Sequence, residues 1–255
     1  MTRTSPWGSL DLSHGRTVQL DVGTLHLEVM RTPTEAWVRP SRPHADREVP
    51  EEDWRRWSIP EDAGLELRPA VPDRLLVVAH EYPFRLPAHR RARVYVRVPL
   101  FAQMIARSPE IGEIVIADEP GIVLSDTWWG TWQEGELAYW LSTTARAQVT
   151  DDLFVPHAAM CPIHLENVSA EALPVDRFAV RAQHLSLFGH GRRIWTDDVR
   201  VRYQAAAEGS EIRFGGGAPE EAPDARMLAG PRIPLRRGLQ ARTFDRLRAL
   251  SMLGG

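Results

Sequence analysis

Hydrophobic and polar residues alternate along most of this chain, which is the pattern of β-strands with one buried face. Residues 16–22 and 24–30 carry apolar side chains at every second position and meet at Gly23, so they predict two strands joined by a tight turn. Further strands are predicted at residues 35–39, 65–68, 74–80, 91–98, 113–117, 159–165, 178–182, 199–203 and 212–214. Many short strands separated by turn residues predict an all-β fold, mainly antiparallel, with one or two β-sandwich-like domains.

Three segments depart from simple alternation. Residues 100–107 are apolar but too short for periodicity to distinguish a helix from a strand. The apolar positions change parity near residues 183–184, which predicts a β-bulge. Residues 238–253 place apolar side chains at helical spacing and predict a short C-terminal helix. The predicted organisation is a β-rich domain over residues 1–150, with a proline- and charge-rich loop insertion at 40–64, followed by a β-sandwich-like domain over 151–255 that ends in this helix.

The most aromatic stretch is residues 126–147, which holds four of the nine tryptophans. Residues 128–132 and 137–142 predict the arms of a β-hairpin around a turn that contains Gly135. In such a hairpin Trp128 and Trp132 share one face and Trp129 takes the other. Because bulky side chains on both faces favour an interior position, we expect Trp129 and Trp140 to be mostly buried. The alternative is that Trp128, Trp129, Trp132 and Trp140 form a binding platform for sugar rings or for a partner.

Composition excludes several classes of enzyme. All 31 basic residues are arginine, so a Schiff-base lysine, a phosphate-loop lysine and a kinase lysine are impossible in this chain. A formal net charge of −3 gives no specific signal for nucleic acid. The single cysteine, Cys161, excludes an intrachain disulfide and a cysteine-rich zinc module. Residues 1–10 show no apolar run of signal-peptide length, so we expect a cytoplasmic protein.

Candidate chemistry is sparse. His157, Cys161 and His164 have the spacing closest to a metal-ligand pattern, but Cys161 and His164 have opposite strand parity and should leave opposite faces. His184 and His190 could add ligands only if the predicted bulge redirects them. Arginines concentrate near the C-terminus, where Arg236 and Arg237 are the candidates for contact with an acidic partner or, as a minor alternative, a membrane surface. No cofactor is expected from this pattern.

Six short motifs occur together in a characteristic order: WGSL (7–10), VPL (98–100), WG (129–130), GELAYW (135–140), PIHLEN (162–167) and PLRRGL (234–239). In order and spacing they resemble the domain-of-unknown-function family 432 of archaea and bacteria, over nearly the whole chain. Shorter members have a tyrosine in place of Trp129 and lack much of the 40–64 insertion. The resemblance carries over no catalytic residue and implies only a β-rich soluble protein of this size.

Three hypotheses of function follow from the sequence. The first is a non-enzymatic binding or scaffolding module with a protein partner, which the lack of any converging nucleophile, base or ligand set in the sequence favours. The second is a metal-dependent hydrolase that uses His157 and Cys161. The third is a carbohydrate-binding module that uses the tryptophan platform, which requires exposed, nearly coplanar indoles.

Overall fold

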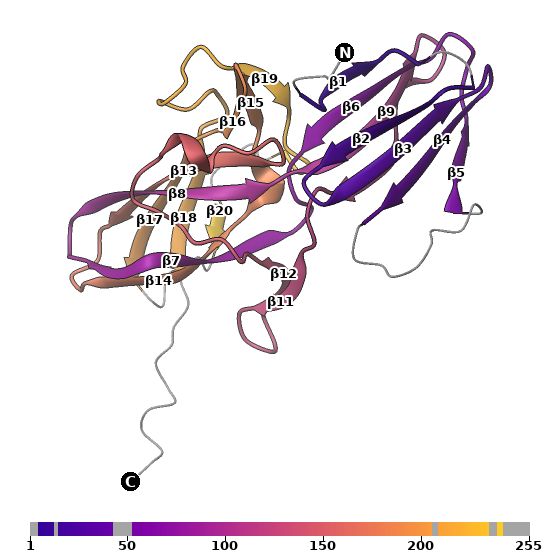
Figure 1. Cartoon of the computed structure of the whole chain (residues 1–255). Coiled ribbons are helices and arrows are strands. Elements are labelled where there is room, and N and C mark those ends of the chain that lie inside the picture. The colour runs from indigo at the N-terminus through magenta and orange to yellow at the C-terminus, as the bar shows by residue number, and fades with distance from the viewer. Residues whose placement is uncertain (1–4, 13–14, 43–52, 206–208, 235–238, 242–255) are drawn as a thin grey trace.

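The structure is a computed structural model that describes residues 5–12, 15–42, 53–205, 209–234 and 239–241. These residues form an all-β protein of four sheets, mostly antiparallel (Figure 1), and one sheet curls into a half-barrel. No α-helix occurs among them, and the helical segments with defined bounds are two short 3-10 turns, η2 (Asp151–Leu153) and η3 (Ala182–His184). Nor does this part of the chain contain a helix long and apolar enough to cross a bilayer.

The first two sheets enclose one hydrophobic core. One sheet has the order β2 (Thr17–Val22), β3 (Leu25–Arg31), β4 (Glu35–Ser41) and β5 (Arg55–Ser58). The other has the order β1 (Gly8–Leu10), β6 (Gly64–Ala70), β9 (Phe101–Ser108) and β10 (Gly112–Pro120). Alternate residues of both sheets are buried in a single cluster that includes Leu27, Val38, Leu67 and Met104. The alternation of the sequence is therefore the direct cause of this core, since every second side chain enters it.

The other two sheets enclose the larger core. One has the order β11 (Ser125–Trp129), β12 (Glu136–Trp140), β7 (Leu75–Leu86) and β14 (Leu173–Val180). The path of the eight-stranded sheet is β19 (Arg226–Ala229), β15 (Leu187–His190), β16 (Arg193–Thr196), β13 (Ala158–Asn167), β17 (Val199–Ala205), β18 (Gly209–Phe214) and β20 (Leu239–Ala241), with β8 (Arg91–Pro99) also paired to β13. Their shared cluster includes Val78, Val96, Cys161 and Phe178.

The two groups of sheets are interleaved along the chain. Strands β6 and β9 are neighbours, yet β7 and β8 lie between them in sequence and pair with β14 and β13 of the larger group. Late in the chain, Arg232 reaches back to the first group, where its Nη1 and Nη2 contact both carboxylate oxygens of Asp118 on β10 and its Nε donates to the carbonyl of Val71. The predicted division into domains at residue 150 stays a prediction.

The structure confirms the predicted β2–β3 hairpin, in which Val22 pairs with Leu25 across the two-residue turn. It resolves residues 100–107 as a strand, β9, because both neighbours β6 and β10 use its backbone hydrogen bonds. The change of parity near residue 183 comes from the turn η3, so the predicted β-bulge is wrong. Part of the predicted loop 40–64 is the strand β5, and residues 43–52 lie outside the described residues.

The predicted C-terminal helix is wrong where the structure describes it. Residues Leu239–Ala241 form β20 and pair with Ile212, Glu211 and Ser210 of β18. Residues 242–253 of that prediction lie outside the described residues, as do Arg236 and Arg237. The spacing of apolar residues favoured a helix because spacing does not show which strand has an unpaired edge. Here the edge of β18 is open to another strand, and this segment pairs with it.

Candidate functional site

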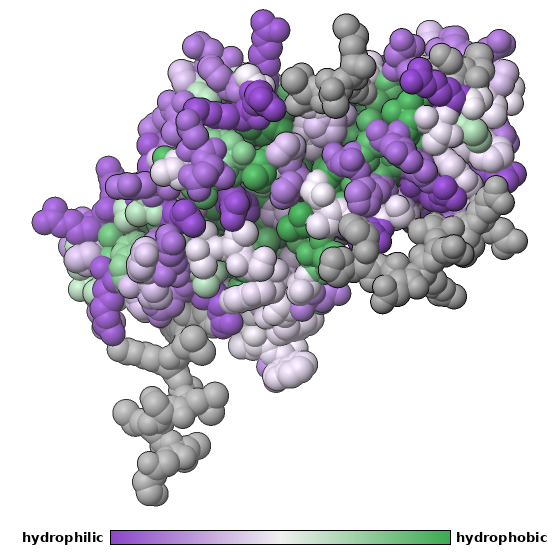
Figure 2. All heavy atoms as spheres, in the orientation of Figure 1, coloured by the Kyte–Doolittle hydropathy of each residue, from purple (hydrophilic) through white to green (hydrophobic). Residues whose placement is uncertain are grey.

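The tryptophan hairpin forms as predicted but with shorter arms. Strands β11 and β12 pair with Trp128 opposite Leu137 and Ser125 opposite Trp140. Trp132 lies in the connecting loop, where 89% of its surface is exposed, and its ring stacks on Trp128 with a centroid separation of 6.4 Å and an interplanar angle of 26°. The hairpin projects from the body of the molecule (Figures 1 and 2), so the stacked pair is presented to solvent.

The loop is shaped around the Trp128 ring. The indole Nε1 of Trp128 donates a hydrogen bond to the carbonyl of Thr131 at 3.0 Å. The ring also covers Gly135, where a Cβ atom would lie 2.1 Å from Nε1, so the close approach requires glycine. The left-handed residue of the loop is Gly130, with φ of 109°. These contacts fix the Trp128 ring, on which Trp132 stacks.

The other two tryptophans, on the opposite face of the hairpin, differ in burial. Trp129 is buried, as predicted, whereas Trp140 is 37% exposed and the prediction of a buried ring is wrong. The guanidinium of Arg177 lies 5.9 Å from the centroids of both rings. Trp140 therefore lies beside the charged group of Arg177, at the solvent-exposed edge of the apolar patch that contains Trp129.

The candidate metal ligands do not converge. Cys161 is fully buried in the larger core, whereas His157 and His184 are half-buried. The Nδ1 atom of His184 donates a hydrogen bond to the carbonyl oxygen of Ile233 at 2.7 Å. Within the described residues, the His, Cys, Asp and Glu side chains that bring three ligand atoms together are His164, Asp198 and Glu220. His164 of the predicted pattern belongs to this group, whereas His157, Cys161 and His184 do not.

Cys161 is expected to be an inert thiol. Burial raises its pKa well above the ordinary value of 9.0, which disfavours the nucleophilic thiolate. We predict that a thiol reagent at pH 8 labels the native protein no faster than the protein unfolds, and that labelling becomes immediate in urea. The pKa of Cys161 is higher in the folded protein than in the unfolded chain, so the free energy of unfolding should fall as the pH rises above about 9. Fast labelling without urea would contradict the prediction.

The converging group already contains a cation from the chain. Arg93 Nη2 lies 3.1 Å from Nε2 of His164, 3.6 Å from Oδ1 of Asp198 and 3.3 Å from Oε2 of Glu220. The same nitrogen lies 3.0 Å from Glu221, whose carboxylate also accepts from the hydroxyl of Tyr95. Burial and this hydrogen bond raise the pKa of Tyr95 to about 12. The group is therefore an arginine-centred ion network.

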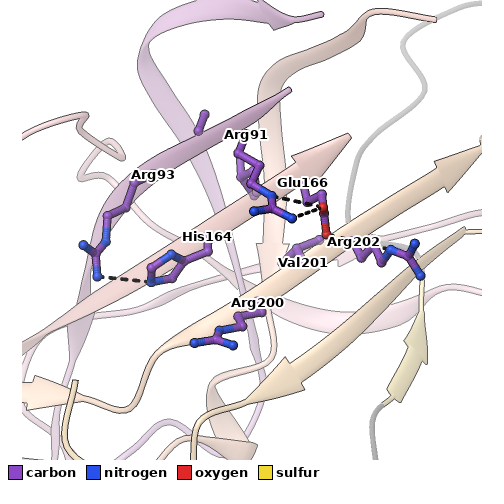
Figure 3. A pocket seen from close by; sticks show the side chains of 9 residues that line it. Arg91, Arg93, His164, Glu166, Arg200, Val201 and Arg202 are labelled. Carbon is purple, nitrogen blue, oxygen red and sulfur yellow. Dashed lines mark hydrogen bonds and ion pairs between the residues drawn. The ribbon is translucent and has the colours of Figure 1, made fainter. Parts of the chain in front are cut away.

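Next to this network is a groove of about 560 Å³ on the outer face of the eight-stranded sheet (Figure 3). The register of β8, β13 and β17 places the side chains of the groove in two rows across these three strands. One row is Arg93, His164 and Arg200, and the other is Arg91, Glu166 and Arg202. The lining thus has four arginines and a single carboxylate. Arg91 donates twice to Oε1 of Glu166, at 3.0 and 2.6 Å.

Sequence reasoning missed this groove. The sequence does contain one sign of the groove. Arg91 and Arg93 are two residues apart in an alternating segment, as are Arg200 and Arg202, and this spacing places each pair on one face of a strand. The signal was incomplete because strand parity does not reveal which strands are neighbours. The groove requires the parallel pairing of β13 with β17, and these strands are distant in sequence.

The fold and the geometry above define an all-β protein of mostly antiparallel sheets, whose prominent surface features are a tryptophan loop and an arginine-lined groove. The particular family follows from comparison with known families: residues 6–248 match the family described as "Protein of unknown function (DUF432)", and the chain belongs to it. This confirms the resemblance carried by the six motifs. Comparison with curated proteins and with solved structures gives no match.

Proposed function

We propose that this protein is a non-enzymatic binding module, built of β-sandwich-like domains, that contacts a partner protein through the loop between β11 and β12. The observation that carries the proposal is the stacked pair of Trp128 and Trp132, of which Trp132 is 89% exposed. Trp132, Trp128 and Leu137 are all exposed on this hairpin, and contiguous exposed apolar residues are typical of interaction sites. Tryptophan is also among the residues that contribute most to protein–protein binding.

The loop is organised before binding. The hydrogen bond from Trp128 to Thr131 and the contact with Gly135 fix the ring on which Trp132 stacks. A partner would therefore lose little binding free energy to ordering of the loop. Leu137, opposite Trp128 and also exposed, extends the apolar surface along the hairpin.

The metal-dependent hydrolase is the weaker hypothesis on geometric grounds. Its nucleophile or ligand, Cys161, is enclosed in the core with a raised pKa, and His184 is engaged by a backbone carbonyl. A hydrolase needs these groups around one reacting atom, with access for substrate.

One observation favours the carbohydrate-binding hypothesis. The two indole planes differ by only 26°, which is close to the coplanar arrangement that a sugar platform requires. The rings stack on each other, however, so a sugar would reach mainly the outer face of Trp132. Protein contact uses the edges and faces of both rings and is the better fit.

The proposal is tested by photo-crosslinking in cells that produce the protein. A photoreactive phenylalanine analogue replaces Trp132 in one variant and Tyr82 in a matched control, since Tyr82 is also an exposed aromatic residue, at 75%, on strand β7. We expect one discrete protein adduct at position 132 and no equivalent adduct at 82. Trp132→Ala should change stability by at most about 0.5 kcal/mol because the ring is on the surface.

Equal labelling at both positions would contradict a specific partner. Saturable quenching of tryptophan fluorescence by oligosaccharides, abolished by Trp132→Ala, would instead establish the carbohydrate hypothesis.

A further inference from the structure

We infer that the groove between β13 and β17 binds a small phosphate-bearing ligand, held chiefly by Arg200 and Arg202. This inference is independent of the tryptophan loop, which belongs to a different sheet.

The four guanidinium groups of the groove differ in how closely carboxylates hold them. Arg93 is surrounded by Asp198, Glu220 and Glu221, and Arg91 donates to Glu166. By contrast, the nearest carboxylate oxygens to Arg200 and Arg202 within the described residues are 3.9 and 3.8 Å away, too far for good hydrogen bonds. The two side chains are 68% and 52% exposed and have donors free to bind a ligand.

These two arginines line the groove from a single strand. Arg200 and Arg202 are two residues apart on β17, so both project from the same face, roughly 7 Å apart along the strand. His164 and Glu166 occupy the matching positions on β13, in parallel register. Figure 3 shows Arg91 and Arg202 on either side of Glu166, with Arg200 beside His164. The groove is therefore walled by guanidinium groups on two sides.

The charge and the hydrogen-bond donors of the groove indicate the class of ligand. One carboxylate can be satisfied by one guanidinium, as the pair of Glu166 and Arg91 shows. The guanidinium groups of Arg200 and Arg202 are held by carboxylates only at 3.9 and 3.8 Å, and a ligand with two negative charges and several acceptor oxygens, such as a phosphate-bearing one, matches the donors that remain. A volume of about 560 Å³ exceeds that of a phosphate ion and falls within the usual range for sites of small organic ligands.

The test uses pyrophosphate as the probe, with calorimetric titration of the full-length protein at constant ionic strength. The Arg200→Ala/Arg202→Ala variant should bind at least about tenfold more weakly, since each charge-assisted hydrogen bond lost costs that order of affinity. The matched control, Arg85→Ala/Arg226→Ala, removes the same charge from two exposed arginines on β7 and β19 and should bind as the wild type does.

A second variant gives an effect of opposite sign. Glu166→Gln removes the only carboxylate that lines the groove and releases donors of Arg91, so it should bind pyrophosphate several-fold more tightly. A purely structural role for Glu166 would lower the melting temperature without raising affinity, and that result would overturn the inference. So would equal loss of affinity in the control variant. Succinate binding as tightly as pyrophosphate would overturn the phosphate assignment, and single-stranded DNA binding more tightly than pyrophosphate would overturn the small-molecule assignment.

Discussion

Replacing Asn167 by alanine is expected to destabilise the fold by about 2–4 kcal/mol, with a fall in melting temperature of roughly 5–15 °C. Asn167 is the only asparagine of the chain and is fully buried. Its Nδ2 donates to the carbonyls of Leu86, Pro87 and Glu171 at 3.0, 3.1 and 2.7 Å. One amide thus joins the end of β7 to the turn that follows β13. Alanine would leave these acceptors without their donor and would open a cavity.

Two further variants make the Asn167 prediction specific. Asn167→Asp should be worse than Asn167→Ala at pH 7, because a carboxylate would face three carbonyl oxygens, and it should recover partly at low pH, where a protonated acid can donate. Ser169→Ala is the matched control: it removes hydrogen bonds to Oδ1 of Asn167 and to Glu171 but leaves the Nδ2 donors in place, so it should cost at most about 1 kcal/mol. Thermal melts at pH 5 and 7 measure all three, and an Asn167→Ala melt within a degree of wild type would refute the assignment.

Gly23→Ala should cost more than about 3 kcal/mol, because it combines backbone strain with a collision. Gly23 has φ of 64° in the turn between β2 and β3. A Cβ at this position would lie 2.4 Å from the carbonyl oxygen of Gly121 and 3.0 Å from the ring of His157. The Gly121 carbonyl accepts from Thr24 at 2.8 Å, and its amide donates to Leu100 at 2.8 Å, so the obstructing backbone is held on both sides.

The matched control is Gly191→Ala. Gly191 also begins a two-residue hairpin turn, between β15 and β16, and its φ is 61°, but a Cβ there would meet no atom within 4 Å. It should therefore show only the left-handed penalty, roughly 1–2 kcal/mol. Urea denaturation of both variants isolates the steric part as the difference. Equal losses would show that the Gly121 backbone moves aside at no cost.

Alternation in the sequence predicted which faces of the strands are buried, and it did so well for local hairpins. The β2–β3 pair follows from adjacency and from a glycine turn. The same reasoning could not show that β8 pairs with β13, or that β13 and β17 lie parallel, because periodicity specifies a face and carries no information about distant neighbours.

The candidate site divides in the same way. Trp129 lies on the face opposite Trp128, as local parity within the hairpin predicts, whereas Trp132 reaches Trp128 from the connecting loop. Trp140, by contrast, lies near Arg177, which β14 supplies from far along the chain, so local parity could not predict its surroundings. The arginine groove depends wholly on such distant pairing, so its residues were individually visible in the sequence but their assembly was not.

The interleaving of the two groups of sheets limits how the molecule can come apart. The chain passes between the groups three times, from β6 to β7, from β8 to β9 and from β10 to β11, and each passage is short. A protease that cuts any one of these connections would leave the two groups covalently tethered through the other two, and the pairing of Arg232 with Asp118 would still bridge them. Domains on a single linker can swivel, whereas three short tethers restrain rotation about every axis. The second group carries both the tryptophan loop and the arginine groove, so the first group should keep its orientation relative to both when a ligand binds at either one.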